Sequence, residues 1–344
     1  MTRAAEPQPA PRDGAATLAV LGAGSWGTAL AIHLARNGHV VRLWGRNPET
    51  MAGLEQQRSN TRYLPDIPFP DALTATADLD HALGGADGCL IAVPSHALRA
   101  TLERLVDSAH PPEALVWATK GLDPASREFP HQLIGHYFPG RPMAVISGPT
   151  FAGEVAAGRP TAVTVASDSD ALAGEWLGRL HGPTFRAYSS SDIIGVELGG
   201  AVKNVLAIAT GIADGLGLGA NTRAALITRG LAEAMRLGRC LGAQSETFMG
   251  LAGMGDLVLT CTDDQSRNRR FGLALGRGES LATARGAIDQ VVEGEPTSQA
   301  IRDLARELEV EMPIVEEVHR VLHAGVPPGE AVEHLLAREP KPEY

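Results

Sequence analysis

Cysteine is scarce in this sequence, which has three cysteines among 344 residues. Cys89, Cys240 and Cys261 lie far apart and form no C-x-x-C pair, which excludes a cysteine zinc site and a disulfide-exchange motif. No H-E-x-x-H pattern or nucleophile elbow occurs either, so metal catalysis and acyl transfer have no support. We therefore expect no metal ion and a reducing, cytoplasmic setting.

Basic residues are fewer than acidic ones, 30 against 40, so the formal net charge is -10 at pH 7. Such a chain repels nucleic acid and anionic membranes, so we expect no nucleic-acid partner, and an anionic substrate would need a local basic pocket. The segment Gly14–Ala35 lacks formal charge and could be mistaken for a membrane span or a signal peptide. Because glycines interrupt its apolar run, we expect no membrane span.

The length of the chain exceeds the roughly 250 to 300 residues at which single hydrophobic cores stop growing, which predicts two domains. Apolar residues make up 44% and charged residues 20%, as in ordinary globular proteins. Residues 1–16 are rich in alanine and proline and have no apolar period. We predict a flexible N-terminal extension over these residues.

Short apolar runs alternate with helical stretches from Thr17 to about residue 190. The predicted strands are Thr17–Leu21, His39–Trp44, Gly88–Val93, Ala114–Ala118, Met143–Ser147, Thr161–Ala166 and Thr184–Tyr188. The predicted helices between them are Ser25–Asn37, Pro48–Arg58, Ala97–Val106, Pro124–Tyr137 and Ala171–Leu180. This order is typical of a doubly wound, mostly parallel sheet, so we predict an α/β Rossmann domain over residues 17–190.

Strand signals stop after about Asp192. The rest of the sequence has the pattern of helices with long apolar faces, namely Ile193–Ala213, Thr222–Leu241, Arg269–Leu275, Ser298–Leu308 and Val315–His323. We therefore predict an all-α C-terminal domain over residues 191–340.

A glycine fingerprint follows the first predicted strand and opens the first predicted helix. Gly22, Gly24 and Gly27 fit G-x-G-x-x-G, with Ser25 and Trp26 between the last two glycines. The first glycine allows a tight turn, the second the close approach of a pyrophosphate, and the third the packing of helix on strand. The strand, turn and helix context favours dinucleotide binding over an ordinary glycine turn.

The end of the second strand selects between the two nicotinamide dinucleotides. An aspartate or glutamate there binds the ribose 2′-hydroxyl of NAD, but this chain has Leu43-Trp44-Gly45-Arg46-Asn47. Arg46 could pair with a 2′-phosphate, although a solvated loop arginine is the alternative. We expect NADP(H) as a cofactor, with NAD(H) as a further one.

Two later strand ends also carry polar residues, and ligands bind at this edge of a parallel sheet. Lys120 lies just after the strand Ala114–Ala118 and could bind substrate oxygens, although a lone surface lysine fits this motif equally well. The segment Ser147-Gly148-Pro149-Thr150-Phe151-Ala152 ends the next apolar run. Its glycine and hydroxyl could line the same crevice.

Lys203 occurs within an apolar helical stretch. Gly199 and Gly200 precede it by four and three residues, so they lie on the same helix face and leave room for a ligand. A lysine desolvated there, near other cations, would have a lowered pKa and could exchange a proton with a substrate hydroxyl. The alternative is a lysine at a helix end whose ammonium group extends into solvent.

A glycine-rich segment that ends at Asp256 precedes a group of arginines, which is unusual in an acidic chain. At the start of a helix, Ser266, Arg267 and Asn268 would supply a hydroxyl, a guanidinium group and backbone amides, which together suit a phosphate. The alternative is a solvated charged segment in which Ser266 is a helix cap.

Taken together and in this order, these blocks resemble the bacterial NAD(P)-dependent glycerol-3-phosphate dehydrogenase family from Thr17 onward. The matching segments are GAGSWGTALA, TKG, SGPTFA, GGAVKNVLAIATG, G-x-N-T-R, GMGD and SRN. The resemblance implies a Rossmann domain followed by a helical domain like the C-terminal domain of 6-phosphogluconate dehydrogenase. It also implies interconversion of dihydroxyacetone phosphate and sn-glycerol 3-phosphate with NADP(H) or NAD(H), a role in glycerophospholipid synthesis, and a homodimer.

The resemblance further implies roles for individual residues. Lys203 would accept the proton of the C2 hydroxyl in oxidation and donate it in reduction, and Asp256 would orient lysine and substrate. Substrate contacts would come from Lys120, Gly148, Thr150, Ser266, Arg267 and Asn268. Cofactor contacts beside the fingerprint glycines would come from Ser25, Trp26, Arg46, Lys120, Ala152, Arg267, Val291 and Glu293. Thr150 departs from the serine that is more common in the family but keeps the hydroxyl.

Two other functions fit parts of the sequence. A β-hydroxyacid or 6-phosphogluconate dehydrogenase would share the fingerprint and a helix lysine, but the Ser-Arg-Asn and GMGD segments argue against it. A non-catalytic NADP(H) sensor would have little reason to keep Lys203 and Asp256 beside a phosphate site.

Overall fold

The computed structural model describes residues 14–288, 291–340 and 342. The predicted N-terminal extension lies outside the described residues except for residues 14–16. By their contacts the residues form two compact units. Among the described residues, the sheet unit comprises 14–119, 131–146 and 150–191, and the helical unit comprises 120–130, 147–149, 192–288, 291–340 and 342.

The sheet unit is built on one eight-stranded sheet with the order β3-β2-β1-β4-β5-β6-β7-β8. The strands are β1 (Thr17–Leu21), β2 (Val40–Trp44), β3 (Leu73–Thr76), β4 (Gly88–Ile91), β5 (Leu115–Trp117), β6 (Met143–Ser147), β7 (Thr161–Ser167) and β8 (Phe185–Ser190). β1 pairs in parallel with both β2 and β4, and the strand order reverses beside it. The carboxyl ends of these three strands therefore meet at one edge, where the glycine fingerprint begins.

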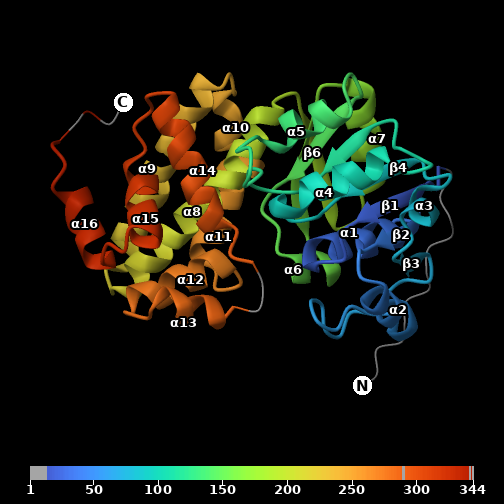
Figure 1. The fold of residues 1–344 in the computed structure, drawn as a ribbon, viewed down its shortest axis with the longest axis horizontal. Helices are drawn as coiled ribbons and strands as arrows, with labels where there is room; N and C mark the ends of the chain where they lie inside the picture. Colours follow the sequence, from blue (N-terminus) through green and yellow to red (C-terminus); the bar gives the residue numbers. More distant parts are fainter. Residues whose placement is uncertain (1–13, 289–290, 341, 343–344) are drawn as a thin grey trace. The chain divides into compact units, whose positions relative to one another are not determined.

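Helices surround this sheet (Figure 1). They are α1 (Ser25–Arg36), α2 (Pro48–Gln57), α3 (Leu79–Leu83), α4 (Ser95–Val106), α5 (Pro130–Tyr137), α6 (Ala152–Ala156) and α7 (Asp170–Leu180). Leu18 to Leu21 of β1 have no exposed surface. Complete burial explains why this strand is a continuous apolar run instead of an alternating one.

The helical unit is organised around α8 (Ile193–Gly215), which packs against α9, α11, α12 and α14. The other elements are α9 (Gly219–Cys240), α10 (Ser245–Met249), a π-helical turn η1 (Leu251–Gly255), α11 (Asp256–Thr262), α12 (Arg267–Gly276), α13 (Leu281–Gly286), α14 (Gly294–Glu307), α15 (Pro313–His323) and α16 (Pro328–Leu336). Among the described helices, α8 alone is long and apolar enough to cross a membrane, and 89% of its apolar window is buried inside the structure. Its composition is that of a core helix.

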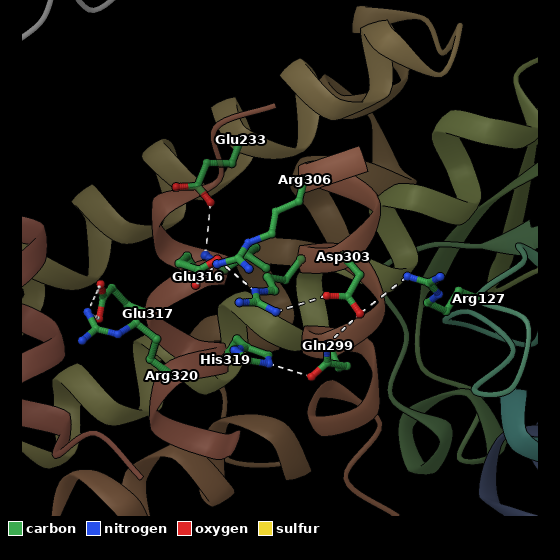
Figure 2. A network of polar contacts seen from close by, with 11 residues as sticks. Arg127, Glu233, Gln299, Asp303, Arg306, Glu316, Glu317, His319 and Arg320 are labelled. Atoms are coloured by element: carbon green, nitrogen blue, oxygen red, sulfur yellow. Dashed lines mark hydrogen bonds and ion pairs between the residues drawn. The ribbon is translucent and has the colours of Figure 1, made fainter. Parts of the chain in front are cut away.

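Ion pairs join the outer helices of this unit (Figure 2). Arg302 and Arg306 of α14 both pair with Glu316 of α15, at 3.1 and 2.9 Å. His319 of α15 forms a hydrogen bond of 2.6 Å with Gln299 of α14. These polar contacts lie beside an apolar interface that includes the buried side chains of both helices, so α14 and α15 pack as one layer.

The prediction of a helix over Pro124–Tyr137 is wrong in its first part, since α5 begins at Pro130. Arg127 has a φ of 62°, a left-handed conformation that a continuous helix cannot contain. Leu122 and Phe129 are buried in the core of the helical unit, and Arg127 pairs with Asp303 of α14 at 3.6 Å (Figure 2). The segment 120–130 is thus held by long-range contacts, which no local pattern reveals. The predicted order of a Rossmann fold followed by an all-α region is confirmed.

Candidate active site

Lys203 lies in the middle of α8, where its side chain is 9% exposed. Gly199 and Gly200 stand about one turn before it on the same face of the helix. A Cβ atom at Gly199 would lie 2.7 Å from the carbonyl oxygen of Ala252, so glycine is needed for α8 to approach η1 this closely. The alternative of a lysine at a helix end that extends into solvent does not hold.

Asp256 begins α11 directly after η1 and meets two lysines. Its carboxylate is 1% exposed, and it accepts hydrogen bonds from Lys203 Nζ through Oδ1 and from Lys120 Nζ through Oδ2, the latter at 2.6 Å. Thr260 Oγ1 donates to the backbone carbonyl of Asp256 at 2.6 Å, which holds the first turn of α11. The GMGD segment therefore places one buried carboxylate between two lysines.

Lys120 reaches this cluster from the segment 120–130, and its side chain is 14% exposed. Lys120, Lys203 and Asp256 all belong to the helical unit, so the cluster forms within one compact body. When both lysines are protonated, the cluster carries one net positive charge. A buried excess of positive charge attracts an anionic substrate and stabilises negative charge on an oxygen atom. The alternative of a lone surface lysine does not hold for Lys120.

The protonation of Lys203 is controlled by this environment. Burial is the main cause that lowers the pKa of Lys203 to about 7; Asp256 opposes the shift and Lys120 adds to it. Burial alone would raise the pKa of Asp256, but Lys120 and Lys203 hold it below its ordinary value. Near neutral pH, Asp256 is therefore ionised while Lys203 can both give and take a proton, as general acid–base catalysis requires.

The residues at the start of α12 have different surroundings. Ser266 is the N-cap, and its Oγ accepts the backbone N–H of Arg269 at 3.2 Å, so its interpretation as a helix cap holds. Arg269 is buried and pairs with Asp214 at 2.6 Å, which ties α12 to the end of α8. Arg267 is half-buried, and its Nη1 donates to the carbonyl of Val291 at 3.2 Å. The segment is therefore not a uniformly solvated run of charge, and Arg267 lies at the helix N-terminus, where an anion is favoured.

Asn204, which sequence reasoning missed, connects three predicted site segments. Asn268 Nδ2 donates to Asn204 Oδ1 at 2.8 Å, and Asn204 Nδ2 donates to Glu293 Oε2 at 3.4 Å. Asn268 Oδ1 in turn accepts the backbone N–H of Gly294 at 2.9 Å. Asn268 and Glu293 are thus linked to the residue that follows Lys203. The available signal was an amide side chain beside the lysine in an otherwise apolar helix.

The glycine fingerprint joins β1 to α1 in the sheet unit. Gly22 has a φ of 121°, and a Cβ atom there would lie 2.7 Å from the carbonyl oxygen of Ala92. A Cβ atom at Gly24 would have nothing within 4 Å, which leaves room for a phosphate. The first turn of α1, which begins at Ser25, has no acidic residue and no side-chain cap, and Trp26 Nε1 is buried without a partner among the described residues. These features fit a dinucleotide phosphate.

Two further contacts shape the fingerprint. A Cβ atom at Gly27 would collide with the carbonyl of Gly22, as expected where a helix packs closely on a turn. Asn60 Nδ2 donates to the carbonyl of Ala23 at 3.1 Å and to Thr28 Oγ1 at 2.8 Å. Sequence reasoning missed Asn60 because it is far from the fingerprint along the chain.

The remaining predicted residues are divided between the units. Arg46 is exposed after β2, and no other described residue forms an ion pair or hydrogen bond with its guanidinium group. Ala152 begins α6 and is half-buried, as is Thr150, and both belong to the sheet unit. Gly148 is buried in the segment 147–149 of the helical unit. The ligand contacts assigned to these four residues stay predictions.

Two family models match the chain. The model described as NAD-dependent glycerol-3-phosphate dehydrogenase N-terminus matches residues 17–173. The model described as NAD-dependent glycerol-3-phosphate dehydrogenase C-terminus matches residues 192–333. The two matches follow the order of the sheet and helices in the structure.

Curated relatives and solved structures agree with these models. The glycerol-3-phosphate dehydrogenase (NAD(P)+) of Thioalkalivibrio sulfidiphilus is 59% identical over 95% of this chain and 98% of its own length. That of Halorhodospira halophila is 57% identical over 96% of this chain and 99% of its own length. The crystal structure of glycerol-3-phosphate dehydrogenase from Coxiella burnetii is 49% identical, with a TM-score of 0.91 over 94% of this chain and 99% of that chain.

Proposed function

Since this chain belongs to the NAD-dependent glycerol-3-phosphate dehydrogenase family, we propose that it interconverts dihydroxyacetone phosphate and sn-glycerol 3-phosphate with NADP(H) or NAD(H). The observation that carries the proposal is the buried cluster of Lys203, Asp256 and Lys120. This cluster combines a proton donor active near neutral pH with a net positive charge, and reduction of a ketone needs both. The product would serve glycerophospholipid synthesis, the role that the family implies.

Lys203 is the acid and base in this proposal. In reduction its ammonium group donates a proton to the C2 oxygen of dihydroxyacetone phosphate, and in oxidation the neutral amine accepts the proton of the C2 hydroxyl. The positive charge of Lys120 stabilises the negative charge that develops on that oxygen. Asp256 balances the two lysines and fixes the positions of their Nζ atoms. When bound, the nicotinamide supplies or accepts the hydride at C2.

We assign the substrate phosphate to the N-terminus of α12. The Arg267 guanidinium group, the hydroxyl proton of Ser266 and the first backbone amides of the helix would contact it. Asn268 uses one N–H for Asn204 and keeps a second for a ligand. Gly148 and Thr150 are proposed as further substrate contacts.

The cofactor phosphates are assigned to the glycine fingerprint. The open space at Gly24 and the unpaired Trp26 Nε1 support this assignment. Arg46 is proposed to pair with the 2′-phosphate of NADP(H), since no carboxylate follows β2 to select the 2′-hydroxyl of NAD(H). Ala152, Val291 and Glu293 are proposed as additional cofactor contacts.

The test is consumption of NADPH in the presence of dihydroxyacetone phosphate, with wild type compared to Lys203→Ala. We expect the variant to lose turnover by about 100-fold to 10,000-fold, the usual contribution of a general acid, while NADPH binding followed by fluorescence is kept. Arg270→Ala, which removes an exposed cation from α12, is the matched control and should keep wild-type turnover. Absence of wild-type turnover refutes the activity, whereas an unchanged Lys203→Ala rate refutes the role of Lys203.

The same assay separates the two other functions. A panel of β-hydroxyacids and 6-phosphogluconate, measured in the oxidative direction, should give no turnover above background. NADPH binding without turnover of any substrate would instead identify a sensor.

We further propose that the protein is a cytoplasmic homodimer. The dimer rests on the family resemblance, and the location on three cysteines that are free in the structure, as expected in a reducing compartment. Light scattering of the purified protein and cell fractionation test the two statements separately.

A further inference from the structure

Ser147 presents a buried hydroxyl that has no partner. The residue ends β6 and is 2% exposed, and its Oγ forms no hydrogen bond with any described residue. Buried hydroxyl groups in native proteins are almost always hydrogen-bonded, because removal from water without a new partner is unfavourable. An exception of this kind points to a partner that binds from outside the chain.

Two residues near this hydroxyl, Gly200 and Lys120, lie within the helical unit. A Cβ atom at Gly200 would lie 3.3 Å from Ser147 Oγ and 3.6 and 3.7 Å from Cγ and Cδ of Lys120. The Ser147 hydroxyl and the methylene groups of Lys120 therefore both lie beside Gly200 of α8, about one turn before Lys203. The segment 147–149, Lys120 and α8 all belong to this unit. Ser147 thus adjoins the charged cluster without taking part in its hydrogen bonds.

We propose that the Ser147 hydroxyl binds the free hydroxyl group of the substrate, at the carbon that carries neither the phosphate nor the reacting oxygen. This inference rests on the proposed function. The substrate has three polar sites. The phosphate is assigned to α12 and the C2 oxygen to Lys203 and Lys120. The further contacts proposed for Gly148 and Thr150 are not assigned to a particular group, so the free hydroxyl has no assigned partner. A serine can donate and accept, which suits a substrate hydroxyl.

The consequence is substrate selectivity. A site that pairs a buried polar group with a substrate hydroxyl rejects an analogue that lacks the hydroxyl, because the protein group is then left unpaired. Ser147 is therefore a specificity-determining residue. The absence of a side chain at Gly200 leaves the space beside the Ser147 hydroxyl open.

The experiment compares two substrates in two enzymes. Wild type and Ser147→Ala are assayed with dihydroxyacetone phosphate and with acetol phosphate, which is the same ketone without the free hydroxyl. We expect Ser147→Ala to lose about tenfold in kcat/KM with dihydroxyacetone phosphate, the equivalent of one hydrogen bond, and to match wild type within about twofold with acetol phosphate. Equal loss with both substrates, or no loss with either, overturns the proposal.

Stability supplies a second and independent readout. Because the Ser147 hydroxyl has no partner to lose, Ser147→Ala should leave the melting temperature of the ligand-free enzyme unchanged or raise it. Ser298→Ala is the matched control: its buried hydroxyl donates to the carbonyl of Glu295 at 2.7 Å, so its removal should lower the melting temperature without changing substrate selectivity. A fall in melting temperature for Ser147→Ala would show that the hydroxyl has a structural partner and would overturn the proposal.

Failure of this inference is distinct from failure of the proposed function. If wild type does not reduce dihydroxyacetone phosphate, the activity itself is refuted. If wild type reduces it but Ser147→Ala shows no selective loss, only the role of Ser147 is refuted.

Discussion

Replacement of Asp256 by asparagine removes the carboxylate that lies between Lys203 and Lys120 while it keeps the shape of the side chain. Opposite charges about 4 Å apart attract by about 4 kcal/mol at an effective dielectric constant of about 20. One unit of pKa corresponds to about 1.4 kcal/mol. Since Asp256 is the group that opposes the effect of burial, its loss should move the pKa of Lys203 further below about 7, by at least about one unit.

The expected kinetic result has a defined sign. Reduction requires protonated Lys203, so kcat/KM for dihydroxyacetone phosphate falls as pH rises through the pKa of Lys203. In Asp256→Asn this limb should move to lower pH, and the reductive rate near pH 7 should fall by at least about fivefold, because a shift of about one unit lowers the protonated fraction of Lys203 from about one half to about one tenth. Oxidation requires the neutral amine, so the limb on which its rate rises with pH should move in the same direction.

The assay is kcat/KM against pH, measured in both reaction directions. Glu246→Gln, which removes an exposed carboxylate from α10 of the same unit, is the control for general charge effects and should leave both limbs in place. If the limbs of the pH profiles of Asp256→Asn stay at the wild-type pH, or move to higher pH, the view that Asp256 sets the protonation of Lys203 is refuted.

Two further predictions concern packing and stability. In Gly199→Ala the new methyl group meets the Ala252 carbonyl oxygen at 2.7 Å, so we expect a loss of about 1 to 3 kcal/mol in unfolding free energy and reduced turnover. Gly174→Ala in α7 is the control, because its methyl group would meet nothing within 4 Å. It should be neutral or stabilising in the same denaturation assay. Burial lowers the pKa of His33 to about 4, so the folded state disfavours protonation of its imidazole. The neutral imidazole therefore contributes to the unfolding free energy in full above about pH 6.5. This contribution, about 3 kcal/mol in total, is lost as pH falls toward about 4. Urea denaturation between these pH values should show the loss, and His33→Gln should show less of it; equal pH dependence in both proteins would contradict the assignment to His33.

The parts of the site that follow from local sequence were predictable. The strand, glycine turn and helix around Gly22 form from neighbouring residues, so their pattern is readable from a short window. Lys203 was identifiable because a charged residue in an apolar helix is costly unless it has a partner. Its lowered pKa follows from burial in α8, which the apolar sequence on both sides already indicated.

The assembly of the acid–base cluster was harder to predict from the sequence. Asp256 was proposed from the family resemblance, and its position between two lysines depends on the π-helical turn η1, for which no sequence pattern was available. Asn60 and Asn204 were missed because each acts on a segment far away along the chain. Hydrogen bonds between distant segments depend on how helices and strands pack, and hydrophobic periodicity carries no information about them.

By itself, the sequence determined the order of strands and helices, the dinucleotide fingerprint and the helix lysine, because backbone geometry and apolar periodicity act over a few residues. Only the tertiary structure decided that Lys120 belongs with the helical unit, since residues 120–130 are held there by the burial of Leu122 and Phe129 and by the ion pair of Arg127 with Asp303. It also decided that the Ser147 hydroxyl is buried without a partner beside that lysine. Burial and pairing are properties of packed surfaces, and the residues that form those surfaces come from separate parts of the chain.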